Sequence, residues 1–143
     1  MSHVSSQVVK GYDKVHPVVL TEGVKVAAQM LALQGQQVTE FVYDWNWNQL
    51  REWKGLKVIC GLGAEQGKFR GVGLAVDKDG KFQLVGDFYG MGNHLKDIQK
   101  AVEKVLGGAC YFAARVLIAQ AKGQKTEVRV NAQTKQLQLV VQM

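Results

Sequence analysis

The sequence predicts an α+β fold, a two-layer sandwich in which a mostly antiparallel sheet of about six strands carries two or three helices on one face. Two observations lead to this prediction. Short segments with strand-like alternation follow one another through tight turns, which is typical of antiparallel neighbours. Two longer segments show apolar residues at helical spacing, and a run of strands separates them. Grouped strands packed against helices indicate α+β architecture.

Length and composition predict a single domain that spans residues 1–143. Of its 143 residues, 47% are hydrophobic and 21% are charged, which is ordinary for a globular chain. A chain of this length can bury a core without disulfide bonds. No internal repeat, linker or low-complexity tract divides the sequence.

The N-terminal part predicts extended segments at residues 3–10 and 15–20, with a turn between them. Pro17 suits an edge strand or a strand start, because proline cannot donate a ladder hydrogen bond. Thr21 is expected to cap a helix whose apolar residues recur every three or four positions. Gly35 is expected to end that helix in a left-handed conformation.

The middle of the chain predicts a run of about four strands. Residues 38–47 alternate, which would place Phe41, Tyr43, Trp45 and Trp47 on one face of a strand. After a turn or short helical segment, the further expected strands are 56–60, 69–76 and 81–88. The segment 77–80 reads as a hairpin turn in which Gly80 supplies a positive φ.

The C-terminal part predicts a second helical region and a closing hairpin. Asn93 is expected to cap the helix, and apolar residues recur at helical spacing after it. Gly107 and Gly108 interrupt the pattern, so one kinked helix and two consecutive helices both fit the region up to Gly123. Two alternating segments, 126–132 and 136–141, are the expected final strands.

The glycine-rich segment 57–77 resembles two nucleotide-binding signals, and neither is complete. A dinucleotide-binding turn needs a helix after its glycines, whereas strand-like sequence follows Gly67. The segment 70–74 resembles an RNA-binding strand but lacks the aromatic residues that stack on bases. We therefore expect a strand, a glycine-rich loop and a second strand.

The sequence does not point to an enzyme. Three histidines are far apart, and none has a partner at metal-ligand spacing, so we expect no metal, no cofactor and no catalytic residue. Cys60 and Cys110 lie in apolar stretches and are expected to be buried hydrophobic residues. The prediction is a small non-enzymatic binding or adaptor protein that acts through a macromolecular partner.

An aromatic and basic segment is the first candidate binding surface. Its residues are Trp45, Trp47, Arg51, Trp53 and Lys54. One interpretation is a strand face buried in the core, and the other is an exposed platform for a protein or for single-stranded nucleic acid. A second candidate site is the turn that carries Asp87, Tyr89 and His94, whose polar groups would serve a small-molecule pocket under the sheet.

The net charge of +6 is compatible with a polyanionic partner, but the basic residues are scattered along the chain. Lys96, Lys100 and Lys104 follow helical spacing, which is typical of a solvated helix face. The polar N-terminal sequence contains no signal peptide pattern, and no run approaches the roughly 20 apolar residues of a membrane span. We expect a cytoplasmic protein without a membrane partner, and a homo-oligomer is compatible with the sequence.

Residues 79–90 carry a motif with a counterpart elsewhere, Asp-Gly-Lys-Phe-Gln-Leu-Val-Gly-Asp-Phe-Tyr-Gly. The chain resembles an uncharacterised family of conserved reading frames from cyanobacteria, red-algal plastids and other bacteria. Members open Met-Ser-His-Phe and carry Asp-Gly-x-Tyr-x-Leu-Val-Ala-Asp-Trp-Trp-Gly. The chain opens Met1-Ser2-His3-Val4 and has Phe88-Tyr89 at the two tryptophans. Members often lie beside genes for AAA-type ATPases, so the resemblance implies an adaptor role with such a partner.

Overall fold

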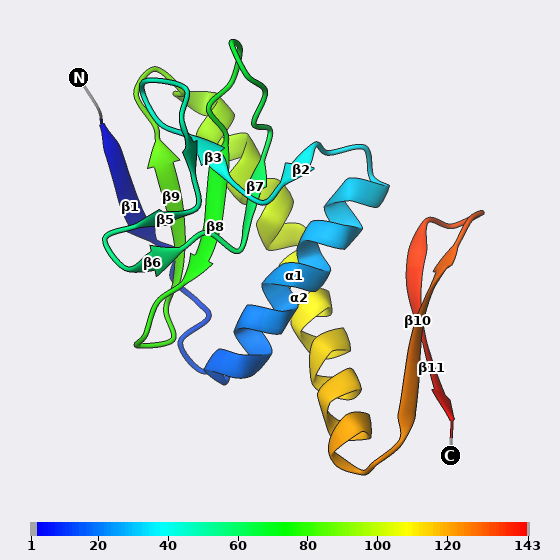
Figure 1. The fold of residues 1–143 in the computed structure, drawn as a ribbon. Coiled ribbons are helices and arrows are strands. Elements are labelled where there is room, and N and C mark those ends of the chain that lie inside the picture. The colour runs from blue at the N-terminus through cyan, green and yellow to red at the C-terminus, as the bar shows by residue number, and fades with distance from the viewer. Residues whose placement is uncertain (1–2, 143) are drawn as a thin grey trace.

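The computed structural model describes residues 3–142 and is built around a five-stranded antiparallel sheet (Figure 1). The order across the sheet is β1 (Val4–Val8), β9 (Phe82–Asp87), β8 (Val72–Val76), β7 (Cys60–Leu62) and β2 (Val38–Thr39). Two helices, α1 (Pro17–Leu33) and α2 (Asn93–Ala121), are described. The α+β prediction is confirmed, but the main sheet has five strands where about six were expected.

The main core lies between the sheet and the two helices. Alternate residues of the central strands, such as Leu74 and Leu84, pack in one cluster with Leu20 of α1 and Leu106 of α2. The other face of the sheet is covered differently. There a smaller cluster joins Ala75 and Val85 to Leu56 and Val58, with Trp53 and Val4 packed against it. The central strands β8 and β9 are therefore buried on both faces, which explains their nearly continuous apolar sequence.

Helix α1 begins earlier than the sequence predicted. Pro17 occupies its first turn, where a missing N–H costs nothing and the fixed φ suits a helix. His16 is the N-cap, and its Nδ1 accepts a hydrogen bond from the N–H of Val18 at 3.2 Å. The predicted strand at 15–20 and the cap at Thr21 are therefore wrong. The helix ends as expected, with Gly35 at a φ of +93° just after it.

The predicted strand 38–47 is interrupted and turns back on itself. After β2, the chain forms two small hairpins, β3 (Val42–Tyr43) with β4 (Gln49–Leu50) and β5 (Glu52–Trp53) with β6 (Leu56–Lys57). Trp45 and Trp47 lie in the turn between β3 and β4, so they do not share a strand face with Tyr43. These hairpins replace the turn or short helical segment expected before residue 56.

The segment from 57 to 88 follows the predicted order with shifted bounds. The expected strand 56–60 is divided between β6 and β7, and β8 begins at Val72, later than expected. A glycine-rich loop joins β7 to β8, as predicted. The hairpin turn at 77–80 is confirmed: the side chain of Asp77 accepts the N–H groups of Asp79 and Lys81, both at 2.9 Å, and Gly80 has a φ of +79°.

The second helical region is one continuous helix of 29 residues, which excludes two consecutive helices. Its N-cap is Gly92 with no side-chain cap, so the prediction of a cap at Asn93 is wrong by one residue. Where α1 and α2 cross, a Cβ on Gly23 would lie 2.5 Å from the Sγ of Cys110. Glycine at this position therefore allows the close approach of the two helices.

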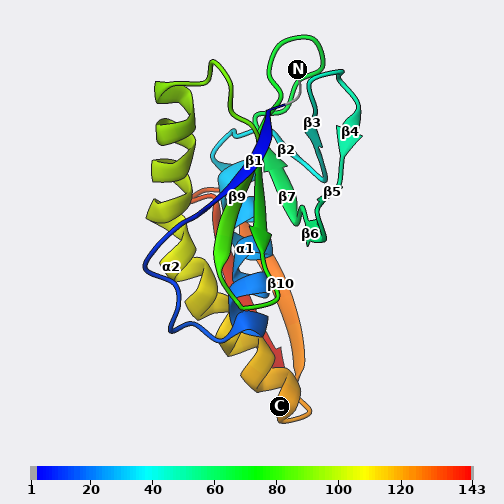
Figure 2. The ribbon, with the colours of Figure 1, turned by 90° about the vertical axis from the view of Figure 1, so that its left-hand side faces the viewer.

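The chain closes with β10 (Lys125–Asn131) and β11 (Gln136–Gln142), which confirms both predicted C-terminal strands. They form a separate two-stranded sheet that does not join the main one. Figures 1 and 2 show this hairpin alongside the helices, and in Figure 1 it lies on the opposite side of them from β5 and β6. It is linked to α2 by a turn in which Gly123 has a φ of +73°.

Candidate binding surface

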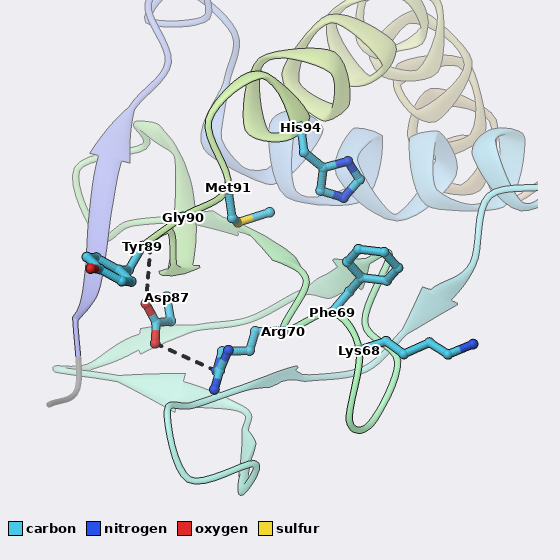
Figure 3. Close-up of a pocket in the computed structure, with 8 residues that line it drawn as sticks. All are labelled: Lys68, Phe69, Arg70, Asp87, Tyr89, Gly90, Met91 and His94. Carbon is cyan, nitrogen blue, oxygen red and sulfur yellow. Dashed lines mark hydrogen bonds and ion pairs between the residues drawn. The ribbon is translucent and has the colours of Figure 1, made fainter.

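Among residues 3–142, Asp87 at the end of β9 is the one charged side chain that is buried, with an exposed fraction of 3%. Its Oδ1 accepts the N–H of Tyr89 at 3.2 Å. Its Oδ2 lies 3.8 Å from the Nε of Arg70, which makes an ion pair (Figure 3). A buried carboxylate requires such partners, because leaving its charge unpaired away from water costs several kcal/mol.

Arg70 joins this carboxylate to the turn between β3 and β4. Its Nε donates to the carbonyl oxygen of Asp44 at 3.2 Å, and its Nη2 donates to the carbonyl oxygen of Trp45 at 3.1 Å. Its guanidinium carbon lies 4.3 Å from the centre of the Trp47 ring, which is a cation–π geometry. One arginine thus fixes the turn against the end of the main sheet.

We call residues 44–48 the Trp45 loop. The side chain of Asp44 accepts the N–H groups of Asn46 and Asn48, both at 2.9 Å, which closes the loop from within. Trp47 has a φ of +63° and packs between Arg70 and Tyr43, whose ring centre is 5.6 Å away. Trp45 remains 48% exposed. The loop therefore presents one large aromatic side chain on a backbone held by several hydrogen bonds.

The second candidate site lies next to this junction. Asp87, Tyr89 and His94 line a cavity of about 290 Å³ together with Lys68, Phe69, Arg70, Gly90 and Met91 (Figure 3). The rings of Phe69 and His94 lie 5.5 Å apart, and Tyr89 is 80% exposed and stacks on His3. The cavity is at the end of the sheet, where β9 leads into α2, and not beneath the sheet as the sequence suggested.

The first predicted surface is divided by the structure. Arg70 binds the Trp45 loop before the start of β8, whereas Trp53 and Lys54 line a groove beside Val76 and Asp77 at the other end of that strand. Lys54 lies over the Trp53 ring at 4.8 Å, and Trp53 is half-buried against the smaller cluster.

Arg51 forms a third cation–aromatic pair, at 5.2 Å from the centre of Phe41, and an ion pair with the exposed Glu40 at 3.5 Å. Trp45 is exposed, Trp47 and Trp53 are half-buried, and none of the three lies on a strand face buried under a helix.

The segment that contains the three tryptophans is not basic. Residues 40–57 include three acidic and three basic residues, so this segment contributes nothing to the net charge of +6. One acid and one base of the segment, Glu40 and Arg51, also form the ion pair described above. An electrostatic footprint for a polyanion is therefore not concentrated here.

The two cysteines are buried, as predicted. Burial raises the pKa of the Cys60 thiol to about 12 and also raises the pKa of the Cys110 thiol. Both thiols stay protonated near neutral pH, and a protonated thiol is a poor nucleophile and metal ligand.

Within residues 3–142, no group of three or more histidine, cysteine, aspartate or glutamate side chains is placed to hold a metal ion. Neither described helix combines the length and the apolar character that crossing a membrane requires.

No family model, curated protein or solved structure matches the chain. The family resemblance of the 79–90 motif therefore stays a prediction. Of the residues that carry it, Met1 and Ser2 lie outside the described part of the chain.

Arg70 is the residue that sequence reasoning missed, although a signal for it exists. In the hairpin of β8 and β9, Gly73 is opposite Val85. Continuing this register by two residues places Asp87 opposite Gly71, next to Arg70. A basic residue beside the start of one strand and an acidic residue at the end of its antiparallel neighbour are expected to meet. The contacts of Arg70 to the Trp45 loop carry no such signal, because they depend on the path of the inserted hairpins.

Proposed function

We propose that this chain is a non-enzymatic binding protein that holds a protein partner through the Trp45 loop. The observation that carries the proposal is the pairing of an exposed side chain with a fixed backbone. Trp45 is 48% exposed, while its carbonyl oxygen accepts a hydrogen bond from Arg70. Tryptophan is among the residues most enriched in binding hot spots, and a rigid loop loses little conformational entropy on binding.

A protein partner fits this surface better than single-stranded nucleic acid. Binding of single strands combines a basic groove with aromatic rings on which successive bases stack. Here one face of each of the Phe41, Trp47 and Trp53 rings is occupied by a cation of the chain itself. Trp45 alone does not form a platform for successive bases, and the segment from 40 to 57 has no net charge. An AAA-type ATPase is one partner to test, because the family resemblance implies it.

Affinity purification with matched baits tests the proposal. Wild-type protein, Trp45→Ala and Tyr111→Ala are immobilised and exposed to extract of the source cells at about 0.5 M salt, which screens most surface charge pairs. Tyr111 is a suitable control because it is 69% exposed on α2. We expect that a partner protein is retained by the wild-type and Tyr111→Ala baits and is not retained by the Trp45→Ala bait.

Equal retention by all three baits would contradict the proposal. A titration of a fluorescent single-stranded oligonucleotide forms the second arm. If it binds with an affinity that falls steeply with salt and depends on Trp45, nucleic acid replaces protein as the partner.

A further inference from the structure

The C-terminal hairpin has one apolar face and one polar face. In its register Thr126 is opposite Val141, Val128 is opposite Leu139, and Val130 is opposite Leu137. Residues that are directly opposite share a face, so these six form one nearly continuous aliphatic surface. The other face carries mainly charged and amide side chains: Lys125, Glu127, Arg129, Asn131, Gln136, Gln138, Val140 and Gln142.

The helices cover the aliphatic face only in part. Val128 lines a groove with residues of α1 and α2, and Leu139 and Val141 line a shallow depression with Ile118 of α2. Val128 is still 45% exposed, Val130 52% and Ile118 56%. A two-stranded sheet alone is marginally stable in water, and this one gains limited burial from the rest of its own chain.

The outer edge of β11 is open and uncharged. Its seven residues, Gln136–Gln142, include no charged residue and no proline. β10 is its one sheet neighbour, and no turn or loop hydrogen bond of the described residues involves the β11 backbone. Exposed edges are usually protected by lysine, proline or a bulge. β10 has such protection in Lys125, Glu127 and Arg129, whereas β11 does not.

The sequence of β11 is complementary to itself in antiparallel pairing. With a two-fold axis at Leu139, Leu137 of one copy is opposite Val141 of the other, and Leu139 is opposite Leu139. All of these lie on the aliphatic face. On the polar face Gln136 is opposite Gln142, and Gln138 is opposite Val140. No like charges meet in this arrangement, and the same surface of each copy is used, as a two-fold interface requires.

We propose that two copies of this chain associate through the outer edges of β11, forming a four-stranded sheet in the order β10, β11, β11, β10. The pairing joins two marginal hairpins into one sheet and extends the aliphatic face across the axis. β1 is another uncharged edge strand of comparable length, but it belongs to the five-stranded sheet and is already supported by the main core. The Trp45 loop takes no part in this contact, so the dimer and the proposed binding function can fail independently.

Molar mass measured by light scattering tests the association. We expect wild type at twice the 15.8 kDa of one chain. The double variant Gln138→Glu/Val140→Glu places two pairs of glutamates directly opposite each other across the proposed axis, which is destabilising. Both positions lie on the polar face of the hairpin, where Arg129 faces position 138, so the variant is expected to fold and to run as a monomer. The matched control Ser5→Glu/Gln7→Glu adds the same charge at the same spacing on the β1 edge and is expected to remain a dimer.

Cysteine crosslinking tests the register. Opposed residues of antiparallel strands have Cα atoms about 4.5 to 5.5 Å apart, within the range of a disulfide. Leu139→Cys is therefore expected to give a covalent dimer under mild oxidation. Val128→Cys is the matched control, because Val128 faces Leu139 within one hairpin. Two Val128 residues would be three strands apart, about 14 Å, and would not crosslink.

Three results would overturn the proposal. The first is a wild-type monomer up to about 0.5 mM, where even weak association populates a dimer. The second is a dimer that persists in Gln138→Glu/Val140→Glu, and the third is equal crosslinking of the two cysteine variants. A monomer that instead binds a foreign extended peptide along β11 would identify that peptide as the occupant of the edge. Far-ultraviolet circular dichroism checks that each variant is folded.

Discussion

Removal of the Arg70 side chain is expected to destabilise the protein strongly. In Arg70→Met the carboxylate of Asp87, 3% exposed, loses its charged partner and has little access to water. Breaking a buried pair in this way costs about 3 to 5 kcal/mol. The Arg70 side chain is 30% exposed, so some water replaces it, and the cost falls to the lower part of that range. Loss of the cation–π contact with Trp47 adds about 1 kcal/mol. We expect a total of about 3 to 4 kcal/mol.

The converse change, Asp87→Asn, is expected to cost only about 1 kcal/mol. Asparagine keeps an acceptor for the N–H of Tyr89, and Arg70 keeps its two carbonyl partners. In the double variant Arg70→Met/Asp87→Asn no buried charge is left unpaired. Its loss of unfolding free energy should therefore be smaller than the sum of the two single losses by about 1 to 2 kcal/mol. Arg51→Met is the matched control. Arg51 also lies over an aromatic ring and beside an acid, but its pair with Glu40 is exposed and is worth less than about 1 kcal/mol.

The assay is urea unfolding followed by circular dichroism as well as tryptophan fluorescence, because Arg70 touches Trp47 and changes its emission directly. Our reasoning would be refuted if Arg70→Met cost no more than Asp87→Asn, or if the two changes were additive. Either result would mean that Asp87 is hydrated or partnered without Arg70.

Two further predictions concern α2 and the hairpin turn. Gly107→Ala and Gly108→Ala should each raise the free energy of unfolding by about 0.5 to 1 kcal/mol, because both are exposed in α2 and a Cβ there meets no atom within 4 Å; a lower melting temperature would argue against a continuous helix. At Asp77 burial acts to raise the pKa, but hydrogen bonds from Lys81, Gln83 and Asp79 outweigh it, so the pKa lies below the ordinary 3.8. A lowered pKa means that ionised Asp77 stabilises the folded state. This stabilisation is complete above the unfolded-state pKa and is lost as pH falls through the folded-state pKa. Asp77→Asn should therefore be less stable than wild type at pH 7, and urea unfolding should show the difference shrinking below about pH 4; a constant difference would contradict the assignment.

The elements that sequence patterns predicted well are those that local chemistry specifies. The turn at 77–80 combines an aspartate that accepts its own backbone N–H groups with a glycine at positive φ, and the structure has both. The apolar spacing of the second helix survives Gly107 and Gly108, since two exposed glycines weaken a long helix without breaking it. The prediction of a strand around Pro17 was wrong because proline suits a strand start and a first helical turn equally well.

The segment 38–57 was predicted poorly because the alternation of residues 38–47 was interpreted as one strand and the small hairpins that follow were not expected. Asp44 and Trp47 reverse the chain through side-chain hydrogen bonds and a left-handed backbone, neither of which periodicity reveals. For the same reason the aromatic residues were grouped as one surface, although Trp53 lies beside the end of β8 farther from Arg70. The grouping of the second candidate site was predicted better. Asp87, Tyr89 and His94 line one cavity because β9 runs directly into α2.

The hold of Arg70 on the Trp45 loop has a consequence for the speed of binding. A loop that must first rearrange limits association at high partner concentration, and the observed rate then levels off. Here the loop backbone already has its hydrogen bonds in the free protein. A partner would meet it in one step, with an observed rate that rises in proportion to partner concentration. Substitutions at Trp45 would then lengthen or shorten the lifetime of the complex while leaving the rate of encounter nearly unchanged.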